Sequence, residues 1–241
     1  MSAPGTFVGT YRTWKSWTPD AFGRYDDSEA RYFEVELSQS GITSLAGKHL
    51  LEVGFGNGAF AAWAKNAGAH YRGTELDPDL VSLGRERGLD AFAATLDFST
   101  ICPDDSQDVV VMFDVLEHLT TDEIVTLLRS VARILKTGGR LIARFPSGDS
   151  PFARAIQHGD ATHRTAIGTS MLSQLAQGSG LSVKQTRSPA FPLTGLGIKR
   201  FVRRAPIAAL RMIVGRTINI AFHDGQNRVL TANIVAVLQK S

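Results

Sequence analysis

Short apolar runs alternate with helix-forming segments from residue 48 to residue 146. The runs that predict strands are 49–53, 70–75, 90–94, 108–113 and 140–145. Helix signals separate them: an alanine-rich stretch after the first strand, the Asp77-Pro78 pair, and a capping box from Thr120 to Glu123. Strand and helix in regular alternation predict a mostly parallel sheet with helices on both faces, the doubly wound α/β fold.

The chain of 241 residues suits one domain with insertions. We expect residues 1–46 to form an N-terminal helical extension. Further apolar runs at 181–186 and 229–238 predict two more strands. The polar stretch 147–169 and the longer stretch 189–226 are expected to be insertions that cap the side of the sheet where a substrate would bind.

The net charge of +3 conceals an uneven distribution of charged residues. Residues 1–160 carry 22 acidic and 15 basic side chains, whereas residues 161–241 carry 11 basic side chains and one acid, Asp224. The basic segment favours contact with an anionic partner or substrate, and a solvated basic face is the alternative.

Compartment and redox chemistry are bounded by what the sequence lacks. Cys102 is the single cysteine and offers neither an intramolecular disulfide nor a thiolate cluster for a metal. Residues 1–9 lack the basic start and apolar core of a signal peptide, and no run reaches the roughly 20 apolar residues that span a bilayer. We therefore expect a cytoplasmic protein.

Three features in the first half of the chain predict a nucleoside-bearing cofactor. The turn after the first strand carries alternate glycines, which permit positive φ and close approach of a ligand: Gly54, Gly56 and Gly58. Glu75 ends the next strand, where a carboxylate can accept both ribose hydroxyls. Asp97-Phe98 follows the third strand and can bind an adenine amino group and cover its ring. Glycines in such a turn can also be needed for packing alone. The prediction therefore rests on the three features together.

Glu52 distinguishes between two kinds of cofactor. The turn lacks the last glycine of the G-x-G-x-x-G pattern that holds a pyrophosphate. An acid at its mouth would repel a pyrophosphate but suits a ligand with an ammonium and a sulfonium. This favours S-adenosyl-L-methionine over NAD. An NAD-dependent oxidoreductase and a non-catalytic nucleotide-binding protein remain as alternatives.

In their order along the chain, these motifs resemble those of class I S-adenosylmethionine-dependent methyltransferases, of the group whose fourth strand ends in an acid and a Glu-His pair. The matching stretches are LEVGFGNG at 51–58, ELD at 75–77, DF at 97–98, FDVLEHL at 113–119 and LKTGGRL at 135–141. The resemblance implies a Rossmann-like sheet of seven strands, with the last strand antiparallel beside the fifth. It implies cofactor contacts from Glu52, Gly54, Phe55, Gly56, Gly58, Glu75, Leu76, Asp97, Phe98, Phe113, Asp114 and Leu116. Phe55 and Asn57 depart from the small residues often found there, which changes the shape of the pocket rather than the assignment.

A methyltransferase acting on a hydroxyl needs a base, because attack by a neutral alcohol builds positive charge on oxygen. His118 in the Glu-His pair is one candidate, and His163, oriented by Asp160, is the other. Each has a structural alternative: His118 as a residue that orients its loop, and His163 in a loop packed by its own hydrogen bonds. The spacing of His158, Asp160 and His163 matches no strong metal template, so we predict no metal.

The basic, apolar segment 198–216 resembles an interfacial amphipathic helix pair, which would lie on an anionic membrane or grip a phosphate-bearing acceptor. The alternative is a helix whose apolar face packs on the fold. A peripheral contact through 198–216 would bring the cytoplasmic protein to the inner face of the membrane. The oligomeric state stays open.

The C-terminal half, with its polar cluster 158–163, is similar to methyltransferases of bacterial surface-polysaccharide or glycolipid synthesis. We therefore expect O-methylation of a small polar or glycan-type acceptor. A quinone-like or natural-product acceptor is the alternative, for which aromatic lining of the insertions is expected. Nucleic acid is not expected as a partner, because no N-P-P-Y-type motif follows the fourth strand and no aromatic-interleaved basic platform occurs.

Overall fold

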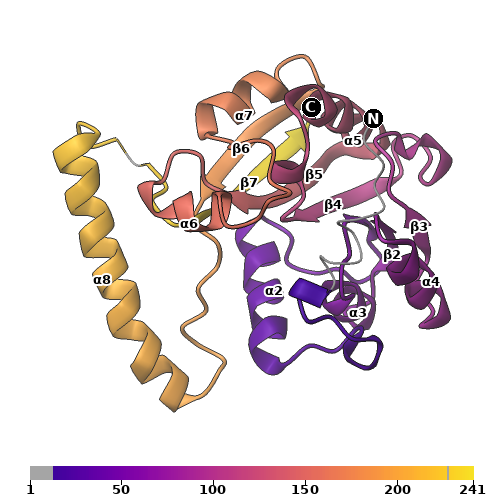
Figure 1. Cartoon of the computed structure of the whole chain (residues 1–241), viewed down its shortest axis with the longest axis horizontal. Helices are drawn as coiled ribbons and strands as arrows, with labels where there is room; N and C mark the ends of the chain where they lie inside the picture. Colours follow the sequence, from indigo (N-terminus) through magenta and orange to yellow (C-terminus); the bar gives the residue numbers. More distant parts are fainter. Residues whose placement is uncertain (1–12, 227) are drawn as a thin grey trace.

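The computed structural model describes residues 13–226 and 228–241, which are built around one sheet of seven strands in the order β3-β2-β1-β4-β5-β7-β6 (Figure 1). The strands are β1 (His49–Val53), β2 (His70–Glu75), β3 (Ala91–Ala93), β4 (Gln107–Phe113), β5 (Leu135–Pro146), β6 (Leu181–Arg187) and β7 (Asn233–Lys240). From β3 to β5 every pair is parallel, whereas β7 runs antiparallel to both β5 and β6. The predicted fold, including the antiparallel last strand, is confirmed.

Helices connect the strands, and two of them start at the predicted capping signals. The helices are α2 (Asp27–Gln39), α3 (Ala59–Asn66), α4 (Pro78–Glu86), α5 (Thr121–Ile134), α6 (Arg154–Gln157), α7 (Thr169–Ala176) and α8 (Ile198–Phe222), and the short 3-10 turns are η1 (Pro19–Ala21), η2 (Phe98–Thr100), η3 (Leu116–His118) and η4 (Pro151–Ala153). Asp77 caps α4, and Thr120 with Glu123 forms the capping box of α5. Asp26 and Glu29 form a second capping box at α2.

The core lies on both faces of the sheet. Because side chains alternate along a strand, Val109 and Val111 of β4 belong to the cluster with α2, α3 and α4, whereas Val110 and Met112 belong to the cluster with α5 and α7. All four are fully buried. Strands covered on both faces explain why the apolar runs of the sequence are continuous rather than alternating.

The described part of the predicted extension 1–46 contains η1 and α2, while residues 1–12, with Tyr11, lie outside the described residues. Buried Glu36 of α2 forms an ion pair with Arg187 at the end of β6 and accepts a hydrogen bond of 2.7 Å from the backbone of Ala190. These contacts fasten the start of the second insertion to α2.

The predicted helix pair in 198–216 is wrong: α8 is one continuous helix with Pro206 inside it. A proline removes one backbone hydrogen bond but does not always end a helix. Figure 1 shows α8 standing beside the body of the molecule rather than on the sheet. The expectation that no segment is long enough to span a bilayer is corrected here: among the described residues, α8 is the one helix whose length and composition would suffice to cross a membrane. Only 6% of its most apolar window is buried.

Candidate active site

A cavity of about 950 Å³ opens at the carboxyl ends of β1, β2 and β4. The strand order reverses between β1 and β4, which is the place where open α/β sheets bind ligands. The ends of these strands line one side of the cavity, while α2 and residues 190–192 of the second insertion line another.

The turn after β1 brings backbone to the cavity at two glycines. Gly54 has φ +76° and Gly56 has φ +52°, a region that side chains other than glycine adopt rarely. A Cβ atom on Gly54 would lie 2.8 Å from the Val115 side chain, and one on Gly56 would lie 2.8 Å from the Trp17 ring. Both positions therefore require glycine for conformation and for space.

Glu75 stands at the end of β2, where the sequence predicted a ribose-binding carboxylate. Its carboxylate accepts hydrogen bonds from the backbone N–H groups of Gly56 at 2.8 Å, Leu76 at 2.7 Å and Asp77 at 3.1 Å. Burial raises the pKa of Glu75, while these backbone hydrogen bonds oppose the shift. The three donors fix the carboxylate in one orientation at the cavity wall.

Glu52 also lines the cavity, and it is almost completely buried. The Tyr71 hydroxyl donates a 2.7 Å hydrogen bond to its carboxylate. Burial raises the pKa of Glu52 to about 8. A cation bound beside it would reverse that shift, because an opposite charge stabilises the ionised carboxylate.

Phe55 fills space that two other glycines provide. Its ring lies so close to Gly73 of β2 and Gly84 of α4 that a Cβ atom on either would be 2.9 Å and 3.3 Å from it. The ring also meets Phe22 edge to face, with centroids 6.2 Å apart. The departure from a small residue at position 55 is thus matched by small residues in the neighbouring elements.

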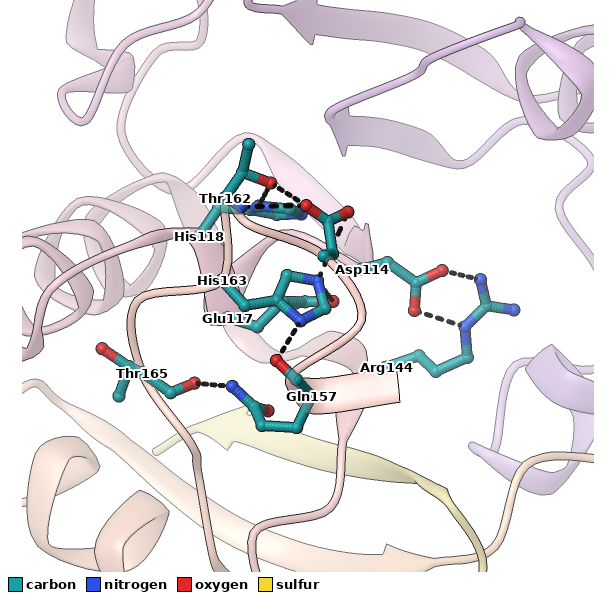
Figure 2. Close-up of polar contacts among 9 residues, drawn as sticks. Asp114, Glu117, His118, Arg144, Gln157, Thr162, His163 and Thr165 are labelled. Atoms are coloured by element: carbon teal, nitrogen blue, oxygen red, sulfur yellow. Dashed lines mark hydrogen bonds and ion pairs between the residues drawn. The ribbon is translucent and has the colours of Figure 1, made fainter. Parts of the chain in front are cut away.

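The end of β4 carries an ion pair that the sequence did not predict. Asp114 has φ +59° and binds the Arg144 guanidinium from β5 through both carboxylate oxygens (Figure 2). Arg144 also donates a 3.0 Å hydrogen bond to the Tyr32 hydroxyl. Burial opposes the charge of Arg144, but Asp114 and Tyr32 together outweigh it and raise the arginine pKa. The pair joins α2, β4 and β5 at the cavity wall, which Phe113 and Asp114 also line as predicted.

Asp97 and Phe98, predicted to bind adenine, are not among the residues that line the cavity. Asp97 caps η2 by accepting a 3.0 Å hydrogen bond from the backbone of Ser99, and its side chain is 65% exposed. The 3-10 turn directs Phe98 into the core, where it is fully buried. Residues 94–96 line the cavity in their place. The prediction for these two residues is corrected accordingly.

Two further predicted cofactor residues have packing roles. Leu116, the first residue of η3, is fully buried in the core. Gly58 lies under Phe22, whose ring is 2.8 Å from the position of a Cβ atom on this glycine. The remaining predicted cofactor residues do line the cavity: Glu52, Gly54, Phe55, Gly56, Glu75, Leu76, Phe113 and Asp114.

His118 is the predicted catalytic histidine that reaches the cavity. Its Nδ1 lies 2.9 Å from the Thr162 hydroxyl, and that hydroxyl donates its proton to Asp160. Nδ1 must therefore carry the proton of this hydrogen bond, which places the basic lone pair on Nε2. Burial and then the neighbouring His163 lower the pKa of His118, so the ring is neutral at pH 7.

His163 does not line the cavity, and its ring lies next to that of His118 (Figure 2). The centroids of the two rings are 4.8 Å apart, and the rings meet edge to face. The side chain of His163 is 6% exposed, and its Nδ1 donates to the backbone oxygen of Gln157 at 3.1 Å. Its Nε2 is 3.8 Å from Asp160 and 4.0 Å from Glu117. Asp160 accepts a hydrogen bond from the Thr162 hydroxyl and also lies near His163. The sequence predicted only that Asp160 would orient His163.

Glu117 lies beside His118 and His163, and the three side chains together are of the kinds that bind metal ions. Burial, and then the charge of Asp114, raise the pKa of Glu117 to about 8. Donor atoms of Glu117, His118 and His163 lie within 4.8 Å of one another, a spacing at which they could hold a metal ion. The predicted absence of a metal is not tested by this arrangement and stays a prediction.

The opposite side of the cavity contains residues that the sequence did not single out. Aromatic rings come from the N-terminal extension and from the second insertion, and Arg204 comes from the first turns of α8: Trp17, Tyr32, Phe191 and Arg204. Trp17 is one of four aromatic residues in the polar stretch 11–22, a sequence pattern that could have indicated an aromatic cover. Arg204 stacks on Phe191 at 5.1 Å and lies in the predicted basic run.

Comparison with known proteins matches residues 51–143 to the family described as "Methyltransferase domain". A ubiquinone biosynthesis O-methyltransferase of Xanthomonas oryzae pv. oryzae is 32% identical over 104 residues, which are 40% of this chain and 42% of that protein. One of Aeromonas salmonicida is 24% identical over 158 residues, or 58% and 65% of the two chains. The matches thus span less than two thirds of the length of these relatives.

A solved structure extends the likeness to the whole fold. The S-adenosylmethionine-dependent methyltransferase from Archaeoglobus fulgidus superimposes with a TM-score of 0.62 at 15% identity, covering 98% of this chain and 100% of that one. The sheet order, the glycine turn, the carboxylate after β2 and the family match agree with one another. Residues 51–143 therefore match a methyltransferase domain, and the chain shares the fold of that S-adenosylmethionine-dependent methyltransferase.

Proposed function

We propose that this protein transfers a methyl group from S-adenosylmethionine to a hydroxyl oxygen of a phenol-like or quinol-like acceptor. The observation that carries the proposal is the position of His118. It is a neutral histidine that lines the same cavity as the glycine turn and Glu75.

The described residues fit the cofactor that the family implies. Glu75 is held by three backbone N–H groups in an orientation suited to a ribose diol. Buried Glu52 supplies the carboxylate for an ammonium group, and the positive φ of Gly54 and Gly56 leaves backbone open to a ligand. When bound, the cofactor supplies an electrophilic methyl group on a sulfonium.

The chain's own contribution is orientation and exclusion of water. The Trp17 ring covers Gly56 from the N-terminal extension, and Phe113 forms part of the wall beneath it. Holding two reactants in line in a dry cavity is where most of the acceleration of such a displacement arises.

Nε2 of His118 accepts the proton of the acceptor hydroxyl as the new oxygen–carbon bond forms. The Thr162 hydroxyl, which donates to Asp160, holds the ring through Nδ1. In this arrangement Asp160 and Thr162 are positioning residues, and His163 packs edge to face against the His118 ring. The proton leaves from His118 to solvent after the product departs.

The acidity of the acceptor favours a phenol over a sugar. A phenol ionises near pH 10, whereas the pKa of water, about 15.7, is a guide to that of an aliphatic alcohol. A histidine of lowered pKa is a weak base, so it is better matched to the more acidic hydroxyl. The rings of Trp17, Tyr32 and Phe191 in the cavity wall also suit a planar acceptor. Relatives named for ubiquinone biosynthesis agree with this choice.

A glycan-type acceptor that carries phosphate is the second candidate. It is supported by Arg204, a cationic side chain in the cavity wall from a segment without acidic residues. An arginine fork matches the geometry of a phosphate group.

The test is a methyl-transfer assay with radiolabelled cofactor and two panels of acceptors: catechols and quinols, and phosphorylated sugars. Label is expected in an ether of the phenolic panel. Transfer only to the sugar panel would favour the second candidate. Calorimetric titration provides the control on the cofactor, and binding of NAD without binding of S-adenosylmethionine would contradict both.

A further inference from the structure

The surface of α8 is unusually apolar for a helix that packs on little else. Ten of its large apolar side chains are exposed: Ile198, Phe201, Val202, Ile207, Leu210, Met212, Ile213, Val214, Ile220 and Phe222. Val202, Leu210, Ile213 and Ile220 each expose about 60% of their surface. Soluble proteins rarely leave contiguous apolar patches of this kind uncovered, and those that do use them for binding.

The few contacts of α8 define which side faces the protein. Arg204 and Arg211 both stack on Phe191, with their Cζ atoms 5.1 Å and 4.5 Å from the ring centroid. Near the other end, buried Asn219 exchanges hydrogen bonds with the backbone of Arg228. Val202, Ile213 and Ile220, by the helical repeat, lie on one stripe that faces away from these contacts. The apolar stripe is therefore directed outward.

The charge of α8 identifies its partner. The helix carries six basic residues and no acidic one: Lys199, Arg200, Arg203, Arg204, Arg211 and Arg216. A second copy of this chain would bring an equally basic helix to the same patch, so self-association is opposed by repulsion. An anionic lipid surface satisfies both the apolar stripe and the positive charge.

The sheet decides how α8 can meet a bilayer. The helix is inserted between β6 and β7, which are hydrogen-bonded neighbours from Leu181↔Lys240 to Arg187↔Val235. A helix that crossed the membrane would leave β7 on the opposite side from β6. To return, residues 223–232, which contain no helix or strand where the structure describes them, would have to cross the hydrocarbon with unpaired backbone. Although α8 is long enough to cross a bilayer, this connection to β7 prevents it from doing so.

From these observations we infer that α8 is an interfacial anchor, which lies along the surface of an anionic lipid bilayer with its outward apolar stripe among the acyl chains. The basic residues at its flanks meet the lipid phosphates. This inference does not depend on the proposed acceptor or on methyl transfer.

The inference is tested by flotation of the full chain with vesicles of phosphatidylcholine and phosphatidylglycerol, compared with vesicles of phosphatidylcholine alone. Binding is expected to the anionic vesicles, at least roughly tenfold tighter than to neutral ones, and to weaken in 1 M salt. Alkaline carbonate should release the protein, because it does not span. No binding, equal binding to both vesicles, or resistance to carbonate would each overturn the inference.

Two variants separate the apolar stripe from the charge. The combined change Val202→Ser, Ile213→Ser and Ile220→Ser is expected to abolish flotation, and Lys199→Glu with Arg203→Glu is expected to weaken it by roughly tenfold or more. The matched control is Phe152→Ser, an exposed apolar residue outside α8, which should float as the parent does. Each variant is first shown to keep the parent melting temperature and S-adenosylmethionine affinity. Folded stripe variants that float like the parent would overturn the inference.

Discussion

The two sides of the cavity are constructed by different means. On the side of β1, β2 and β4, strand ends and their first turns line the cavity, and they bring in the acids Glu52, Glu75, Asp77 and Asp114. On the other side, the lining residues come from the N-terminal extension and the insertion 189–226, and that insertion is basic and partly exposed. This difference supports the proposal that the sheet holds the cofactor, while the additions to the sheet select the acceptor.

The largest effect is expected on turnover, from a substitution that removes the proposed base and leaves the cofactor side of the cavity unchanged. His118→Ala is expected to lower turnover by roughly 10²- to 10⁴-fold and to leave S-adenosylmethionine affinity within about twofold, because the base is lost while Glu75 and the glycine turn are intact. His163→Ala should cost less, since this ring does not line the cavity. Single-turnover rates and calorimetry measure the two quantities. A greater loss from His163→Ala would restore His163 as the base.

The pH profile is the control for this assignment. Since the pKa of His118 is lowered from its ordinary 6.5, its basic form persists through neutral pH and is lost only as the pH falls below that value. The parent rate is therefore expected to fall on the acidic side. In His118→Gln, this acidic limb should be absent from the residual rate.

The next effect concerns the cofactor side. Glu75→Gln is expected to weaken S-adenosylmethionine binding by roughly 10- to 100-fold, because hydrogen bonds to a charged acceptor are worth about 1.5–3 kcal/mol. Asp97→Asn is the matched control and should change the affinity by less than about twofold, since the side chain of Asp97 does not line the cavity. Equal losses in the two variants would restore Asp97 as an adenine ligand.

A smaller effect is expected on stability. The pKa of Glu52 rises from 4.5 to about 8 on folding, so between these values the folded chain holds a proton that the unfolded chain has lost. Its contribution to the free energy of unfolding is complete below pH 4.5 and disappears as the pH rises through 8. Glu52→Gln should therefore be the more stable protein at pH 8, by about 1–2 kcal/mol, and should bind the cofactor more weakly.

Urea unfolding of the ligand-free protein at pH 5 and pH 8 measures this difference. Glu34→Gln, which removes an exposed carboxylate, is the control and should leave the difference between the two pH values unchanged. A parent whose stability increases from pH 5 to pH 8 while Glu52→Gln behaves identically would show that Glu52 is ionised in the folded state.

The smallest expected effect is none at all. Since no metal is predicted, a chelator should leave methyl transfer unchanged, although Glu117, His118 and His163 stand close enough to share an ion. Turnover in the presence of excess EDTA, with and without added Mg²⁺ or Zn²⁺, is the measurement. A loss that one of these ions restores would assign the cluster to metal-assisted chemistry.

The sequence predicted the sheet well because its signals are local. The run of valines in β4, the Asp77-Pro78 cap and the glycines after β1 each report on a few neighbouring residues. Glu52 and Glu75 could be placed for the same reason, since the end of a parallel strand fixes where the next side chain emerges.

The failures occurred where local signals compete or where distant segments meet. Asp97 follows β3 as expected, but the 3-10 turn that it caps turns Phe98 into the core. Which of His118 and His163 lines the cavity depends on how the loop 158–164 folds back on η3. The spacing of these residues along the sequence does not reveal it. Arg144 and Tyr32 lie 112 positions apart, so their contact at the cavity wall could not be anticipated.

The pairing of β6 with β7 has one further consequence. Because these two strands are adjacent and antiparallel, residues 188–232 form a single excursion from what would otherwise be a simple hairpin. A short turn could close the hairpin without altering any other strand connection. Evolution or an engineer can therefore exchange this excursion without changing the sheet, and the exchange would alter the membrane contact and the acceptor preference that we propose.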